Sequence, residues 1–139
     1  MYLVDTNIWL ERLLDQERSE EVGEFLNRIA TAQLLITDFT LHSIGVILDR
    51  VEQADVLLVF VDDVLLRGEI GLVSLRPESM HRLVSVMEEY ELDFDDAYQY
   101  VAAEQTQATI VSFDADFDHT ERQRKMPIDV LNEMGATSA

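Results

Sequence analysis

Short runs of apolar residues alternate along this chain with stretches in which apolar residues recur every three or four positions. The runs are bounded by polar residues, as buried strands are, and they lie at 2–5, 34–37, 72–75 and 109–113. The other stretches have the periodicity of amphipathic helices, with Val22, Phe25 and Ile29 as one example. Helices are therefore expected at 7–14, 18–32, 39–50, 53–67, 77–89 and 94–107. Strand is an alternative for the middle of 53–67, and 128–131 is a candidate last strand.

Strands thus alternate with helices along the whole chain, which is typical of a parallel sheet covered on both faces. We expect an α/β fold with three layers, α/β/α, around a central, mostly parallel sheet of four to five strands. Short polar side chains can cap the first turns of its helices, with Thr6 or Asn7 at the first helix and Asp38 or Thr37 at the third. No repeat or Pro/Gly-rich linker divides the chain, so 1–139 is expected to be a single domain.

The composition narrows the class of protein. Hydrophobic residues make up 47%, an ordinary globular value, and cysteine is absent, which rules out disulfides and thiolate metal sites and fits a reducing compartment. The N-terminus has neither a basic region nor a long apolar run, so we expect no signal peptide. The longest apolar stretch, 56–66, is interrupted by Asp62 and Asp63 and is too short to span a bilayer. A cytoplasmic protein without a membrane segment is the expectation.

The net charge of −18 is unusual, because 28 acidic residues face only 10 basic ones. Such a field repels the phosphates of nucleic acid. One explanation is a local cluster, Arg122, Arg124 and Lys125, that contacts phosphate shortly after Asp114, although a charge run of this kind is also typical of a solvated surface. The other is a very salty cell, since at about 1 M salt the Debye length is about 3 Å and self-repulsion fades.

Three aspartates stand where an α/β fold places its chemistry. Asp5 ends the first predicted strand, Asp114 follows the strand at 109–113, and Asp96 begins the helix at 94–107. Groups at the carboxyl ends of parallel strands face a common crevice. Each aspartate alone is better explained as a helix cap or as an acid favoured by the helix dipole. Together they would repel one another unless a cation binds, and Mg²⁺ and Mn²⁺ prefer such oxygen ligands.

Three segments of the chain, 3–8, 92–97 and 110–117, resemble in order and spacing the PIN-domain family of metal-dependent nucleases, and particularly its VapC-type ribonuclease toxins. The resemblance implies that Asp5, Asp96 and Asp114 are the metal-binding and catalytic aspartates. It also implies supporting roles for three neighbouring positions, Asp116, Asn7 and Ser112.

The same resemblance implies an activity and partners. Such proteins cleave RNA phosphodiester bonds with Mg²⁺ or Mn²⁺, and in toxin–antitoxin pairs a second protein blocks the active site. For a chain this acidic, we expect an antitoxin with a basic tail. We also expect a homodimer, and the apolar stripe at 53–67 is either core or its two-fold interface.

The chain departs from the family at one acidic position. The family usually has a glutamate early in the helix after the second strand, and that position falls on Ser43. Asp38 could substitute as a ligand, although helix capping is its other interpretation. The alternative function is therefore a catalytically impaired PIN-like protein that binds other proteins. A dehalogenase-type phosphatase is disfavoured, because it needs a second aspartate where Asn7 stands.

Overall fold

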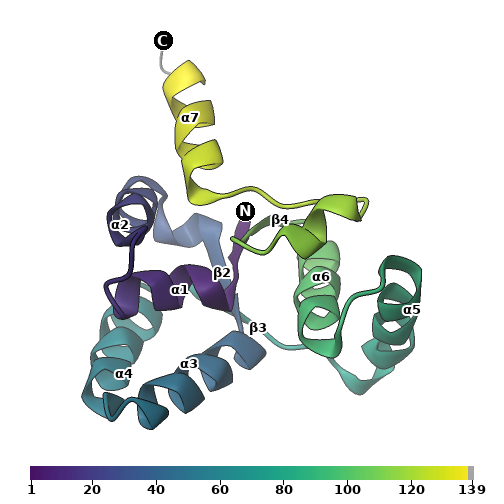
Figure 1. Ribbon diagram of the computed structural model, residues 1–139, viewed down its shortest axis with the longest axis horizontal. Helices are drawn as coiled ribbons and strands as arrows, with labels where there is room; N and C mark the ends of the chain where they lie inside the picture. Colours follow the sequence, from purple (N-terminus) through teal and green to yellow (C-terminus); the bar gives the residue numbers. More distant parts are fainter. Residues whose placement is uncertain (138–139) are drawn as a thin grey trace.

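The computed structural model of the protein describes residues 1–137 and has a four-stranded parallel sheet at its centre (Figure 1). The strands are β1 (Tyr2–Val4), β2 (Leu34–Thr37), β3 (Gly71–Val73) and β4 (Thr109–Val111). Their order is β3-β2-β1-β4, and each neighbouring pair is parallel. Tyr2 lies opposite Leu34 on one side and Thr109 on the other. The expected α/β architecture is confirmed, with four strands.

Helices cover both faces of this sheet (Figure 1). The helices on one face are α1 (Thr6–Leu13), α2 (Ser19–Arg28), α3 (Asp38–Arg50), α4 (Ala54–Phe60) and α7 (Pro127–Thr137). Those on the other are α5 (Met80–Tyr90) and α6 (Phe94–Thr106). Short 3₁₀ turns lie at η1 (Thr31–Gln33), η3 (Pro77–Ser79) and η4 (Ala115–His119). No helix within 1–137 is both long and apolar enough to cross a bilayer.

Alternate side chains of the central strands point to opposite faces, as the strand period of two requires, and they divide the core in two. Val4, Ile36 and Val111 pack against α1–α4 and α7. Leu3 and Ile110 pack against α5 and α6. Because both faces are buried, the strands are apolar throughout rather than alternating, which explains why they stand out as short hydrophobic runs.

The stripe at 53–67 is helical, so the strand alternative for its middle is wrong. It begins as α4 and continues as a π-helix, η2 (Val61–Arg67). The apolar residues of its stripe pack onto the core of the α1–α4 face, among them Phe60, Val61 and Val64. The stripe is therefore core, although Leu58 and Val59 on the other side of α4 remain exposed.

The candidate strand at 128–131 is wrong, because these residues form the start of α7. An alternating strand would bury Ile128 together with Val130, but Ile128 is 40% exposed while Val130 and Leu131 are buried at helical spacing. Asp129 accepts a hydrogen bond from the backbone N–H of Met126 at 2.9 Å, as an acidic residue in a first helical turn does. At the edge of β4 the structure has only an isolated parallel bridge between Val111 and Lys125.

The helix starts beside the sheet's carboxyl edge are capped by strand-end side chains. Asp5 caps α1 by accepting from Thr6 N, so the expected caps Thr6 and Asn7 lie one and two residues too late. Thr37 caps α3 by accepting from Thr40 N, which selects Thr37 over Asp38. The chain turns sharply from strand to helix at these points, and polar side chains are thereby gathered at one edge of the sheet.

Candidate metal centre

Asp5 lies directly after β1 and is 7% exposed. Its Oδ1 accepts hydrogen bonds from Thr6 N at 2.8 Å and Gln99 Nε2 at 2.9 Å. Its Oδ2 accepts from Ser112 Oγ at 2.7 Å and, more weakly, from Asn7 Nδ2 at 3.4 Å. Burial raises the pKa of Asp5, and these hydrogen bonds offset the rise only in part. Asp5 is thus a buried, firmly oriented carboxyl group.

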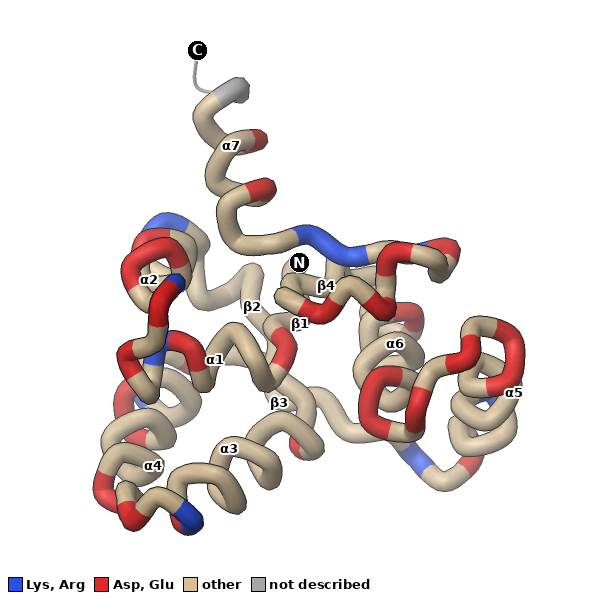
Figure 2. The backbone as a smooth tube through the Cα atoms, viewed as in Figure 1, with Lys and Arg blue, Asp and Glu red and all other residues tan. Residues whose placement is uncertain are grey.

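Three further carboxylates converge beside Asp5, from the start of α6 and from the segment after β4. The backbone of both segments has acidic positions (Figure 2). Asp96, Asp114 and Asp116 each offer one oxygen, and these oxygens lie within 4.8 Å of one another. Burial together with the charges of Asp114, Asp93 and Asp5 raises the pKa of Asp96 to about 8. No lysine or arginine within 1–137 forms an ion pair with this cluster. The only cationic influence on it in the described chain is the longer-range attraction between Arg124 and Asp114.

The acid cluster opens onto a pocket of about 300 Å³ between α1, α3 and α6. Its acidic lining comes from Asp5, Asp95, Asp96 and Asp114. The rest of the lining is polar near the strand ends and apolar farther out, and consists of Thr6, Asn7, Leu10, Phe39, Ser43 and Ile47. A small ligand in this pocket therefore contacts the carboxylates on one side and the α1–α3 surface on the other.

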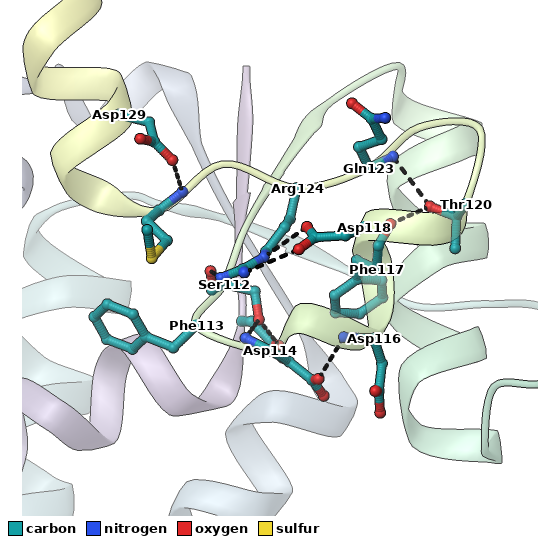
Figure 3. A network of polar contacts seen from close by, with 12 residues as sticks. Ser112, Phe113, Asp114, Asp116, Phe117, Asp118, Thr120, Gln123, Arg124 and Asp129 are labelled. Atoms are coloured by element: carbon teal, nitrogen blue, oxygen red, sulfur yellow. Dashed lines mark hydrogen bonds and ion pairs between the residues drawn. The ribbon is translucent and has the colours of Figure 1, made fainter.

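The segment after β4 is shaped around Ser112 (Figure 3). Ser112 is buried, and its hydroxyl donates to Asp5 and accepts from Asp114 N at 2.9 Å. Asn7 Nδ2 donates to the same hydroxyl at 3.2 Å, and Asn7 Oδ1 accepts from Phe113 N at 3.1 Å. Asp114 in turn caps η4 by accepting from Asp116 N. The predicted supporting residues Asn7, Ser112 and Asp116 therefore all lie at the site.

Gln99 is a site residue that sequence analysis missed. It lies on α6, three residues after Asp96, and is 1% exposed. Its Nε2 donates to both Asp5 and Thr40 Oγ1, and its Oε1 accepts from Thr37 Oγ1 at 2.7 Å. The available signal was a polar residue within the apolar run 97–103 of a helix expected to face the sheet. Gln99 connects Asp5 to the caps of α3.

Asp38 lies away from the acid cluster. Its Oδ1 accepts from Tyr98 OH at 2.7 Å, and its Oδ2 accepts from Ser74 Oγ at 3.0 Å. These contacts tie the start of α3 to α6 and to the segment after β3. Asp38 does not line the acidic pocket.

The three cations considered for phosphate binding are engaged within the protein. Arg122 donates to the carbonyl of Ala108. Arg124 binds both carboxylate oxygens of Asp118 and the carbonyl of Ser112, as Figure 3 shows. Lys125 pairs with Glu133 at 2.8 Å. These contacts brace the segment after β4. None of the three cations forms an ion pair with the acid cluster, although Arg124 is close enough to Asp114 for their charges to attract.

Ser43 lies on α3 and lines the acidic pocket. A glutamate there would have added a further negative charge to a cluster in which repulsion between carboxylates already raises the pKa of Asp96. With serine the pocket keeps a hydroxyl on the α3 side, and its carboxylates come from β1, α6 and the segment after β4.

The donor set fits a hard divalent cation. All the converging ligand atoms are oxygens, and Mg²⁺ and Mn²⁺ commonly bind through a few carboxylates with water completing the shell. Mutual repulsion among the carboxylates is the physical cause of the raised pKa of Asp96, and a bound cation relieves the same repulsion.

Comparison with known proteins places these features in a family. The family model described as PIN domain matches residues 2–123. No curated protein matches the chain.

Several solved structures share the fold. A toxin–antitoxin complex from Klebsiella pneumoniae is similar with a TM-score of 0.70 and 18% identity over 91% of this chain and 98% of that one. VapC20 of Mycobacterium tuberculosis, a Sarcin-Ricin loop cleaving toxin, has a TM-score of 0.73 and 14% identity over 88% and 96%. FitAcB from Neisseria gonorrhoeae has a TM-score of 0.73 and 19% identity over 92% and 99%.

Proposed function

The chain belongs to the PIN-domain family, and from this premise we propose that it is a metal-dependent endoribonuclease, the toxin of a toxin–antitoxin pair. The observation that carries the proposal is the convergence of Asp96, Asp114 and Asp116 within 4.8 Å beside the buried Asp5, with no ion pair to any of the three in the described chain. Residues 1–139 form a single PIN-like domain in this proposal.

Asp5, Asp96 and Asp114 would hold Mg²⁺ or Mn²⁺, and Asp116 is a further candidate ligand because one of its oxygens lies within 4.8 Å of those of Asp96 and Asp114. When bound, such an ion lowers the pKa of water and stabilises negative charge on phosphoryl oxygens. Asp5 has the most firmly set carboxylate, because Oδ1 already accepts two short hydrogen bonds. Its Oδ2 accepts one short hydrogen bond from Ser112 and one long bond from Asn7, so this oxygen is the less firmly engaged of the two. Asp5, Asp96 and Asp114 are the proposed catalytic residues.

The proposed substrate is RNA, and the proposed partner is an antitoxin with a basic tail. The likeness to structures named as a toxin–antitoxin complex and as a Sarcin-Ricin loop cleaving toxin supports both. A net charge of −18 gives a basic tail a strong electrostatic attraction to this chain. A homodimer is part of the proposal, with the exposed Leu58 and Val59 of α4 as candidates for apolar contacts.

The direct test is metal-dependent cleavage. We expect the protein to cut single-stranded RNA in Mg²⁺ or Mn²⁺ and to stop when EDTA removes the ion, because its clustered carboxylates cannot replace the missing positive charge. The measurement is product formation from labelled RNA, with ion restored after chelation as the control. Equal cleavage with and without divalent ion would dispose of the proposal.

The second candidate function is a protein-binding module without catalysis, and Ser43 is the observation that favours it. The pocket has a hydroxyl where the family usually has an acidic ligand, so fewer charges hold an ion. Calorimetric titration with Mn²⁺ separates the two candidates. Saturable binding below millimolar concentration supports the ribonuclease, and its absence supports the binding module.

A further inference from the structure

A second pocket continues from the acidic pocket along α3. It has a volume of about 280 Å³ and is lined by His42, Ser43, Val46, Ile47 and Arg50. Ser43 and Ile47 line the acidic pocket as well, so the two hollows are contiguous. The five lining residues recur at spacings of three and four on one face of α3, and we call this surface the α3 groove.

Arg50, at the far end of the α3 groove, is the cation that the described chain leaves without a partner. Six of the ten basic residues pair with carboxylates: Arg28, Arg67, Arg76, Arg82, Arg124 and Lys125. Arg12 and Arg122 donate to backbone carbonyls, and Arg18 lies over the ring of Phe113. Within 1–137, the side chain of Arg50 has no hydrogen bond, ion pair or ring contact. Among so many carboxylates, its guanidinium remains available to an outside anion.

The other sides of the acid cluster are negatively charged. Asp93 and Asp95 lie at the start of α6, and Asp116 lies on η4, all three of them exposed. The neighbouring Asp118 is paired with Arg124. Figure 2 shows acidic positions at the start of α6, both acidic and basic positions after β4, and one basic position at the end of α3 beside acidic ones. Asp49, the neighbour of Arg50, does not line the groove. A phosphate chain leaving the cluster is therefore repelled on the α6 and η4 sides and attracted along α3.

We propose that the α3 groove is the substrate path, in which single-stranded RNA extends beyond the cleaved bond and Arg50 binds one of its phosphates. The proposal rests on the ribonuclease function above. Seven residues separate Ser43 from Arg50, which is about 10 Å along a helix, so Arg50 binds a different phosphate from the one at the acid cluster. Ser43 lines both pockets, and its small, uncharged side chain neither blocks the junction between them nor repels a phosphate there.

The test compares Arg50→Gln with Arg28→Gln. Both arginines are the last residue of an α-helix, so the two variants lose the same charge and the same favourable interaction with a helix C-terminus. For a labelled single-stranded RNA in Mg²⁺, we expect Arg50→Gln to raise KM about fivefold and to change kcat less than about twofold. The slope of log KM against log salt should fall by about 0.7, as loss of one phosphate contact requires. Arg28→Gln should leave KM and the slope unchanged.

The outcomes separate this proposal from the one on which it rests. If the wild-type protein does not cut RNA, the proposed function fails and the substrate path fails with it. If the wild-type protein cuts RNA but the two variants have the same KM and salt slope, only the role of Arg50 is overturned. A change in oligomeric state on Arg50→Gln, with KM unaltered, also overturns it and assigns the α3 groove to a protein partner.

Discussion

Replacing Asp96 by asparagine is expected to lower RNA cleavage by about 100-fold or more and, without divalent metal, to stabilise the protein at pH 8. Both effects have one cause. Asp96 is half-buried beside Asp114, Asp93 and Asp5, and its burial and these charges raise its pKa to about 8. Asparagine keeps the shape but removes the charge, so it relieves the repulsion and, with it, the attraction for a cation.

The pH dependence of stability follows from the direction of this shift. In the unfolded chain Asp96 ionises near pH 4, whereas in the folded protein it holds its proton up to about pH 8. Between these values the folded state binds more protons, so its stability falls as pH rises through that window. Because Asp96 is partly exposed and solvent screens its charge, we expect a loss of about 2 kcal/mol rather than the full value. Mn²⁺ should abolish the loss by taking the place of the proton.

The measurement is thermal unfolding of the wild-type and Asp96→Asn proteins in EDTA, from about pH 5 to about pH 8. The decline with pH should be shallower in Asp96→Asn. Asp55→Asn is the matched control, because Asp55 is also an acidic residue in a first helical turn but is exposed and outside the cluster. Identical pH profiles for the wild-type and Asp96→Asn proteins, or undiminished cleavage by Asp96→Asn, would contradict the role assigned to Asp96.

The position of the acidic residues at one edge of the sheet could be predicted because two of them directly follow strands. In a parallel sheet the carboxyl ends of the strands share one edge, so Asp5 and Asp114 could be placed together from the sequence alone. The start of α6 could be placed from its first-turn acids, which brought Asp96 to the same edge. Which of the acidic residues lie closest together could not be predicted from the sequence. Asp116 lies close to Asp96 and Asp114, because the chain turns after Asp114 and this turn places the carboxylate of Asp116 near the start of α6.

The errors have physical causes of a different kind. The segment 128–131 has three apolar residues around Asp129 and fits a strand and a helix equally well. Only the burial of Val130 and Leu131 against the α1–α4 face decides for α7. Gln99 was missed because a glutamine on a helix is ordinarily exposed. It is buried here since α6 packs directly against the sheet, and that is a tertiary effect.

Gln99→Leu is expected to be the most destabilising single change at the site. Leucine has a similar volume but no amide, so Asp5, Thr37 and Thr40 each lose a buried hydrogen-bond partner. An unsatisfied buried polar group costs about 1–3 kcal/mol, and partial rearrangement of the threonines leaves a net loss of about 3 kcal/mol. For a chain of this length the melting temperature should fall by about 10 °C. Gln105→Leu, an exposed glutamine on the same helix, is the control and should cost far less.

Stability alone does not distinguish a positioning residue from a structural one, but the pH dependence of cleavage does. The hydrogen bond from Gln99 lowers the pKa of Asp5 against the opposing effect of burial. Without it, Asp5 should keep its proton to higher pH, so the acidic limb of the kcat profile should move upward in Gln99→Leu. The measurement is kcat against pH in saturating Mg²⁺, below the melting range of the variant.

Gln99→Glu provides a test in the opposite direction. A protonated glutamic acid can still donate a hydrogen bond to Asp5, but an ionised one repels it. This variant should therefore lose activity as pH rises. If both variants keep the wild-type pH profile, Gln99 supports the fold without orienting Asp5.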